Sequence, residues 1–91
     1  MKNFEFLWSE EKNEKLQNER NISFKEIVFY INQDKVVDII KNPSSNFDNQ
    51  ECFVIDIENY IWIVPYVKNK NEIFLKTAFP SRKHTKIYLN N

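Results

Sequence analysis

The fold is decided by residues 52–67, whose sequence is CFVIDIENYIWIVPYV. Two runs rich in β-branched and aromatic residues, Cys52–Ile57 and Tyr60–Val67, flank the dipeptide Glu58-Asn59. This pattern predicts a β-hairpin, because asparagine tolerates the positive φ that a two-residue turn requires. Pro65 lies inside the second run and has no N–H, so we expect a bulge or a local break there.

Two further strands are expected around this hairpin. Residues 36–40, VVDII, predict a strand before Pro43, and the polar segment Pro43–Gln50 predicts a loop that folding does not require. A second turn at Lys68–Asn71 leads into another predicted strand, Ile73–Phe79. Strands joined in this way predict a four-stranded antiparallel meander.

The N-terminal segment predicts a short strand and a surface helix. Phe4, Phe6 and Trp8 fit the inner face of an opening strand. Ser9 then precedes two acidic residues, as an N-cap does, and predicts a helix over residues 10–20. The only substantial apolar side chain of this helix is Leu16, so the helix should lie on the surface.

A second helix is predicted over residues 24–33, because Ser23 and Glu26 form a capping-box pattern before an apolar face. Ser81 predicts the cap of a short C-terminal helix. The expected class is therefore α+β, with two N-terminal helices packed on a four-stranded antiparallel sheet and the helices segregated to one face.

Composition excludes several classes of function. A chain of 91 residues with 42% hydrophobic residues fits one domain, residues 1–91. It has no glycine, which excludes the glycine-rich loops that bind nucleotide phosphates. One cysteine, Cys52, and one histidine, His84, cannot build a Cys/His zinc site, so we expect no metal and no other cofactor. No apolar run is long enough to span a bilayer and no secretion signal is visible, so we expect a cytoplasmic protein.

Charge is distributed unevenly along a chain whose net charge is zero. Residues 74–91 contain four basic side chains and no acidic one, whereas residues 1–73 contain nine basic and thirteen acidic ones. A basic segment on an acidic body predicts a local site for an anionic partner. The alternative is a solvated face of the terminal helix.

The basic segment contains the sequence SRKHTK, residues 81–86, in which Arg82, Lys83 and His84 are the candidate catalytic residues. Arginine binds a phosphate through two hydrogen bonds, lysine supplies a point charge, and histidine titrates near neutral pH. These are the groups that a ribonuclease needs. Trp62, Tyr66 and Tyr88 are candidate stacking surfaces for RNA bases, although Trp62 also fits a core position.

Two stretches at opposite ends of the chain resemble one known family. FLWSEEK at residues 6–12, followed by ISFKE at residues 22–26, is similar to the pattern F-E-W-D-x-x-K and V-S-F-E-E of the BrnT-like toxins of bacterial toxin–antitoxin pairs. SRKHTK resembles that family's ending, A-R-[RK]-A-[TN]-[RK]. The resemblance covers both ends of the chain and a compatible middle.

This resemblance implies a RelE-like fold, an RNA-cleaving toxin that arrests translation without a metal, and a cognate antitoxin that binds DNA. Direct DNA binding is then expected only through the antitoxin. A histidine of the family pattern is absent at Glu19-Arg20-Asn21, and Thr77 replaces an arginine. Lys76 lies next to Thr77, but one step along a strand should turn it to the opposite face. The candidate RNA-binding residues are Lys12, Arg20, Lys76, Lys86 and Tyr88.

Two functional hypotheses therefore stay open. The first is a toxin that acts as an endoribonuclease, with Arg20 and His84 as partial substitutes for the missing family residues. The second is a non-catalytic protein-interaction module that binds an antitoxin-like partner. The sequence contains only two arginines, Arg20 and Arg82, which is few for a metal-independent ribonuclease.

Overall fold

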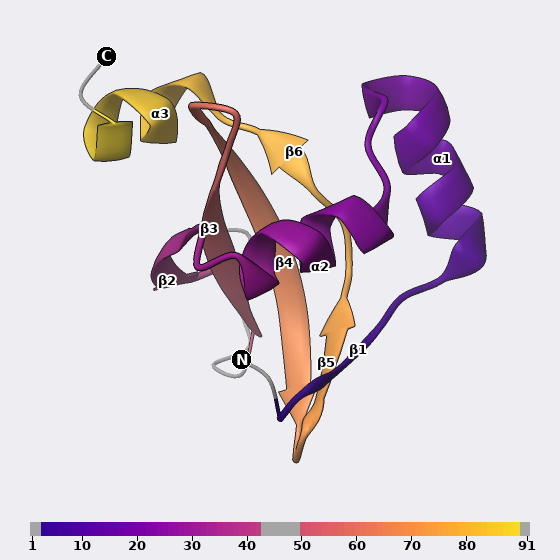
Figure 1. Ribbon diagram of the computed structural model, residues 1–91. Helices are drawn as coiled ribbons and strands as arrows, with labels where there is room; N and C mark the ends of the chain where they lie inside the picture. Colours follow the sequence, from indigo (N-terminus) through magenta and orange to yellow (C-terminus); the bar gives the residue numbers. More distant parts are fainter. Residues whose placement is uncertain (1–2, 43–49, 90–91) are drawn as a thin grey trace.

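The computed structural model describes residues 3–42 and 50–89, and within them the chain forms three helices and six strands (Figure 1). The predicted loop Pro43–Gln50 lies outside the described residues, except for Gln50. In chain order the elements are β1 (Glu5–Leu7), α1 (Glu10–Arg20), α2 (Phe24–Asn32), β2 (Val36–Lys41), β3 (Gln50–Ile57), β4 (Tyr60–Asn69), β5 (Glu72–Leu75), β6 (Phe79–Pro80) and α3 (Arg82–Leu89). The α+β class predicted from the sequence is confirmed.

The sheet is mixed, with the strand order β1-β5-β4-β3-β2 and with β6 paired to β4. β1 runs parallel to β5, and the other paired strands are antiparallel. The predicted four-stranded antiparallel sheet is therefore wrong in two respects. β1 joins the edge of β5, where Phe6 packs against the core, and the expected last strand is divided into β5 and β6. An apolar pattern predicts that a segment is a strand but does not identify its partner.

Pro65 divides the expected last strand. The sequence predicts a bulge or a local break at this position. Pro65 stays in register with Cys52 of β3, so there is no bulge, and the break lies on the β5 side. Toward β5, its carbonyl oxygen accepts a hydrogen bond from the Lys76 N–H at 2.8 Å. Proline has no N–H with which to return that bond, and the ladder ends after the pair Tyr66–Leu75. The chain leaves the sheet at residues 76–78 and pairs again as β6.

The hairpin of β3 and β4 forms with the predicted two-residue turn. Glu58 and Asn59 have φ of 51° and 69°, as both central residues of such a turn require. The Asn59 N–H also donates to the Asp56 carboxylate at 2.9 Å. Asn21, at the end of α1, likewise has a positive φ of 56°, so asparagines take positions that glycine fills in other chains.

Side chains of β3 and β4 alternate between two buried faces of the sheet. The first face packs against α1 and α2 in a cluster of Leu16, Ile22, Phe24, Ile27, Ile31, Phe53, Ile55, Ile57, Val64, Tyr66, Ile73, Leu75 and Ala78. The second face carries Cys52, Val54, Ile61 and Ile63, against which Ile40, Tyr88 and Leu89 pack. The expectation that all helices share one face is therefore wrong, because the apolar side of α3 covers the second face.

The two N-terminal helices contribute unequally to the core. Ser23 Oγ accepts the Glu26 N–H at 3.1 Å, which confirms Ser23 as the N-cap. The Glu26 carboxylate accepts from the Ser23 hydroxyl at 3.1 Å and not from the backbone N–H that a full capping box uses. α2 then buries Phe24, Ile27 and Ile31. α1 buries Leu16 alone and lies beside the sheet in Figure 1, as a surface helix should.

β2 forms one edge of the sheet and is the irregular strand. Its register with β3 shifts between Val36 and Asp38. Val37 and Ile39 are exposed on this edge, at 45% and 43% of their surface. Asp38 lies between them and holds α3 through Tyr88, as described below.

The start of α3 is tied to the backbone of β4 at Ile61. The Ser81 N–H donates to the Ile61 carbonyl oxygen at 2.9 Å. The buried Ile61 N–H donates to the Thr85 hydroxyl at 2.9 Å, and that hydroxyl donates to the Ser81 carbonyl oxygen at 2.7 Å. Thr85 therefore satisfies a buried strand N–H that no neighbouring strand reaches.

Replacing Thr85 tests this connection. Thr85→Val keeps the shape but leaves the buried Ile61 N–H without an acceptor, so we expect a loss of about 1–3 kcal/mol in the free energy of unfolding. Thr85→Ser keeps the hydroxyl and should lose less than half as much free energy of unfolding as Thr85→Val. Urea unfolding followed by circular dichroism measures both, and equal stabilities of Thr85→Val and the parent protein would contradict the assignment.

Candidate functional site

His84 is held at the first turn of α3 by Ser81. The Ser81 hydroxyl accepts the His84 backbone N–H at 3.1 Å, so Ser81 is the N-cap, as predicted. The same oxygen lies 2.7 Å from His84 Nδ1. Because the hydroxyl accepts from the backbone, its own hydrogen is available to Nδ1. A hydroxyl can donate to Nδ1 or accept a hydrogen from it, so this contact orients the imidazole ring through Nδ1 without fixing its tautomer.

His84 borders a groove of about 480 Å³ on the α3 side of the sheet. The groove is lined by Ile40, Asn42, Gln50, Cys52, Ile63, Pro65, Lys76, Thr77, Phe79 and His84. Among the residues that the structure describes, the charged or titratable groups on its rim are Lys76 and His84, and none of the described lining residues is a carboxylate. Burial raises the pKa of the Cys52 thiol to about 11, so Cys52 is a neutral wall residue. The groove therefore combines an apolar floor with a cationic rim.

Lys76 and Thr77 both line this groove. The expectation that Lys76 is turned to the opposite face is wrong, because β5 ends at Leu75 and strand alternation no longer applies at residue 76. Lys76 thus lies beside the position where the family pattern has its arginine.

Lys76 also borders a second hollow, which contains Lys12. This hollow is lined by Ser9, Glu11, Lys12, Lys15, Phe74 and Lys76. The Lys76 ammonium lies 5.9 Å from the centre of the half-exposed Phe74 ring. Two predicted RNA-binding residues, Lys12 and Lys76, therefore line the same hollow. Lys76 also lines the groove that His84 borders.

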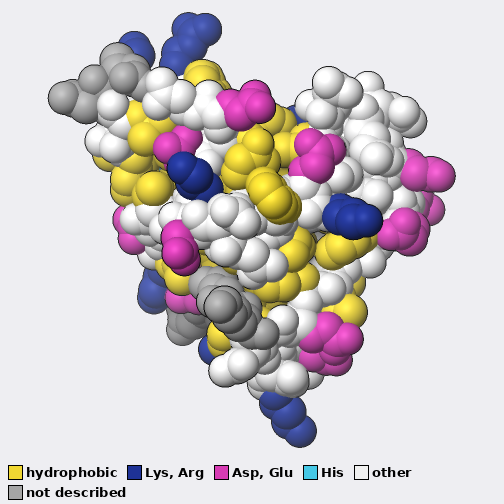
Figure 2. All heavy atoms as spheres, in the orientation of Figure 1, with side chains coloured by type: hydrophobic (Ala, Val, Ile, Leu, Met, Phe, Trp, Pro, Cys, Tyr) yellow, Lys and Arg dark blue, Asp and Glu magenta, His cyan; other side chains and the backbone are white. Residues whose placement is uncertain are grey.

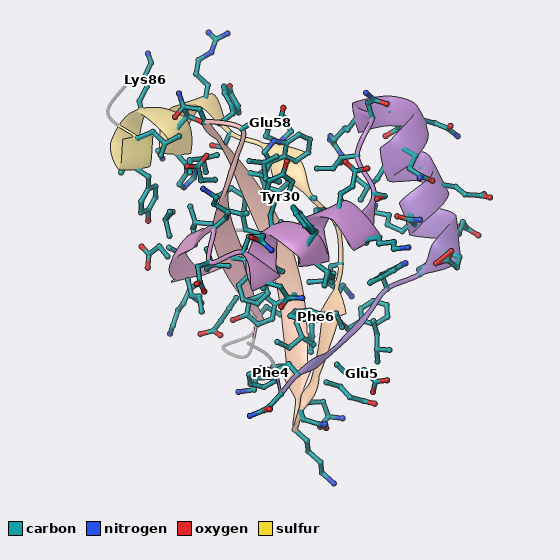
Figure 3. All side chains as sticks on the ribbon, viewed as in Figure 1. Phe4, Glu5, Phe6, Tyr30, Glu58 and Lys86 are labelled. Carbon is teal, nitrogen blue, oxygen red and sulfur yellow. The ribbon has the colours of Figure 1, made fainter. Side chains whose placement is uncertain are left out.

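The other predicted cations are not gathered around His84. Arg82, Lys83 and Lys86 are exposed on α3 and do not line the groove, and Figure 3 shows Lys86 extending away from the sheet. Arg20 lies on the other side of the sheet, where its Nη1 donates to the Ala78 carbonyl oxygen at 3.3 Å. The predicted catalytic trio is thus a row of side chains along a helix, of which His84 alone borders the groove.

Two of the predicted base-stacking aromatics have structural partners. Tyr66 is buried, stacks on Phe53 at a centroid distance of 4.1 Å and donates to Glu51 at 2.8 Å. Burial and this bond raise the pKa of Tyr66 far above its ordinary value. The Tyr88 hydroxyl donates to Asp38 at 2.6 Å, and its ring lies 6.3 Å from that of His84. Tyr66 is excluded as a base platform, and Tyr88 joins α3 to β2.

The apolar floor of the groove is the part of the site that sequence reasoning missed. Cys52 and Ile63 were expected only as core residues, and Ile40 as part of a strand. The available signal was the alternation of β3 and β4, since residues that turn away from α2 must form a second surface.

Within residues 3–42 and 50–89, no three histidine, cysteine or acidic side chains are grouped as a metal would require. None of the helices in the same part of the chain has the length and apolar character needed to cross a membrane. No protein-family model, no curated protein and no solved structure matches this chain.

The hydrogen bond between Tyr88 and Asp38 should affect how the Asp38 carboxyl titrates. The Tyr88 hydroxyl and then the Ile39 N–H hold the pKa of Asp38 below its ordinary value. A lowered carboxyl pKa stabilises the fold above the unfolded value of about 3.9, and the contribution is lost as the pH falls through the folded value. In Tyr88→Phe, the pKa of Asp38 should rise toward its ordinary value in a carboxyl NMR titration. Tyr60→Phe, far from Asp38 in the sheet, should leave that pKa unchanged, and an unchanged value in Tyr88→Phe would contradict the bond.

Proposed function

We propose that this chain is the toxin of a type II toxin–antitoxin pair and a metal-independent endoribonuclease with a RelE-like fold. The observation that carries the proposal is the His84 imidazole, bonded to Ser81 through Nδ1 and bordering a groove whose described lining residues include Lys76 and no carboxylate. The resemblance of residues 6–12, 22–26 and 81–86 to BrnT-like toxins supports the same reading.

The chemistry requires proton transfer and a cation. The 2′-oxygen of a ribose attacks the adjacent phosphorus as its proton passes to a base, and the 5′-oxygen leaves with a proton from an acid. The product ends are a 2′,3′-cyclic phosphate and a 5′-hydroxyl. Imidazole is the side-chain group most often used for such proton transfer, and His84 carries one at the border of the groove. Lys76 would stabilise charge on the phosphate oxygens.

The exposed cations would bind RNA outside the groove. Arg82, Lys83 and Lys86 lie on α3, and Lys12 borders the hollow that Lys76 shares. Side chains in such positions contact flanking phosphates, and their loss weakens binding and reduces its salt dependence. Arg82 has the additional capacity for two parallel hydrogen bonds to one phosphate.

A second candidate function is a non-catalytic interaction module that binds an antitoxin-like partner. The observation that favours it is the placement of Arg82 and Lys83, which lie outside the groove that His84 borders. An enzyme of this kind places a strong cation beside its acid or base, and here that role falls to Lys76 alone.

Cleavage of a mixed RNA by the purified protein, with growth arrest on expression as the cellular readout, tests the proposal. His84→Ala should lower the cleavage rate by about 10²-fold or more, because it removes the proton-transfer group. Arg82→Ala should mainly weaken RNA binding and reduce its salt dependence, because Arg82 lies outside the groove, and Arg82→Lys, which loses the two parallel hydrogen bonds, should also be impaired. Lys25→Ala, at an exposed position of α2, is the matched control for charge loss. Cleavage that His84→Ala leaves unchanged would overturn the role of His84, and a parent protein that binds an antitoxin-like partner without cutting RNA would favour the interaction module.

A further inference from the structure

A second concave site lies on the α2 face of the sheet, opposite the groove. It is a notch of about 290 Å³ between the corner that joins α1 to α2, the outer side of α2 and the β3–β4 hairpin. The notch is lined by Arg20, Asn21, Ile22, Glu26, Tyr30, Ile57, Glu58, Tyr60 and Trp62. All of these residues belong to the described part of the chain, and none of them lines the groove beside His84.

Three aromatic side chains from two elements meet at this notch. Tyr60 and Trp62 are alternate residues of β4 and therefore share the face toward α2. Tyr30 follows Glu26 by four positions on α2, which places both on one side of the helix. Tyr60 is 38% exposed, and Tyr30 and Trp62 are half-buried. The face of a tyrosine or tryptophan ring attracts cations, because the ring carries negative charge density there.

Two carboxylates accompany the aromatic rings. Glu26 accepts a hydrogen bond from Ser23, whereas Glu58 makes no side-chain hydrogen bond or ion pair with any described residue. Figure 3 shows Glu58 in the hairpin turn and Tyr30 on α2 below it, and Figure 2 shows acidic side chains beside a hydrophobic patch at this end of the molecule. Arg20 is the only basic lining residue, and its Nη1 is bonded to the Ala78 carbonyl oxygen. The lining residues therefore carry a net charge of −1.

The turn that presents Glu58 is an unusual position for glutamate. Its φ of 51° is one that Asn, Asp or Gly adopts at lower cost in a two-residue turn. Asn59, the next residue, follows that preference.

We propose that the notch binds the guanidinium group of an arginine side chain from a partner protein. A guanidinium is planar and stacks on the faces of tryptophan and tyrosine, and its paired N–H groups match a carboxylate such as that of Glu58. Lysine lacks both features. Two carboxylates repel the phosphate backbone of a nucleic acid, so RNA is the wrong partner for this face. The inference goes beyond the proposed function and does not depend on cleavage of RNA.

The test uses three blocked tripeptides, acetyl-Ala-Arg-Ala-amide and its lysine and citrulline counterparts. Citrulline keeps the planar group and loses the charge. Trp8→Phe leaves Trp62 as the single tryptophan, so its fluorescence reports on the notch, and amide NMR shifts of residues 58–62 locate the binding. The arginine peptide should bind saturably at millimolar concentration and about twofold to fivefold more tightly than the citrulline peptide, which corresponds to one exposed cation contact.

Variants identify the groups that bind. Glu58→Gln should weaken arginine binding by about twofold to fivefold, because it removes the unpartnered carboxylate while keeping shape and turn. Tyr60→Leu should weaken it without affecting the core. Glu14→Gln, on the exposed side of α1, is the matched control and should change nothing. Equal binding of the arginine and citrulline peptides, equal binding of the lysine peptide, no saturable response, or shifts at the notch caused by an RNA oligonucleotide would each overturn the proposal.

Discussion

The absence of an N–H on Pro65 is the constraint on which the position of the groove depends. Lys76 donates to the Pro65 carbonyl oxygen, but nothing on Pro65 can donate in return, and β5 ends there. Release from the sheet lets Lys76 and Thr77 face the same groove, of which Pro65 is itself a wall. The chain then rejoins β4 as β6 and enters α3 at Ser81, which places His84 opposite Lys76. One missing donor thus brings together side chains that an uninterrupted strand would separate.

The two faces of the sheet have different chemistry because strand side chains alternate. Ile63 of β4 contributes to the groove with the cationic rim, and its neighbour Trp62 contributes to the notch with the two carboxylates. A chain with no net charge can in this way offer one concave surface to an anion and another to a cation. Arg20 and His84, which sequence reasoning grouped as substitutes for missing family residues, belong to different faces.

Features set by neighbouring residues could be predicted from the sequence. These features depend on interactions within a few positions, and they are the N-cap Ser23 with Glu26, the turn at Glu58 and Asn59, and the N-cap Ser81. The partner of β1, the end of β5 and the face covered by α3 could not be predicted, since each depends on contacts between distant segments. The same limit applies to the candidate site, for which the residue types were identifiable but the grouping was not. Lys76 and His84 line the same groove because of the path that the backbone takes, whereas Arg82 and Lys83, which are neighbours of His84 in sequence, do not line it.

The exposed edge of β2 has a consequence for solubility. Val37 and Ile39 are exposed on this edge, and no described strand pairs with its outer side, so a strand of another chain can extend the sheet there. The Ile39 N–H on this side is already bonded to the Asp38 carboxylate. Asp38 stands between the two apolar side chains, and Lys41 ends the strand. Charged residues on an edge disfavour such pairing, and the register shift beside Asp38 further interrupts the template. Asp38 therefore has two tasks, because the carboxylate that holds Tyr88 and α3 in place also discourages the growth of the sheet into an aggregate.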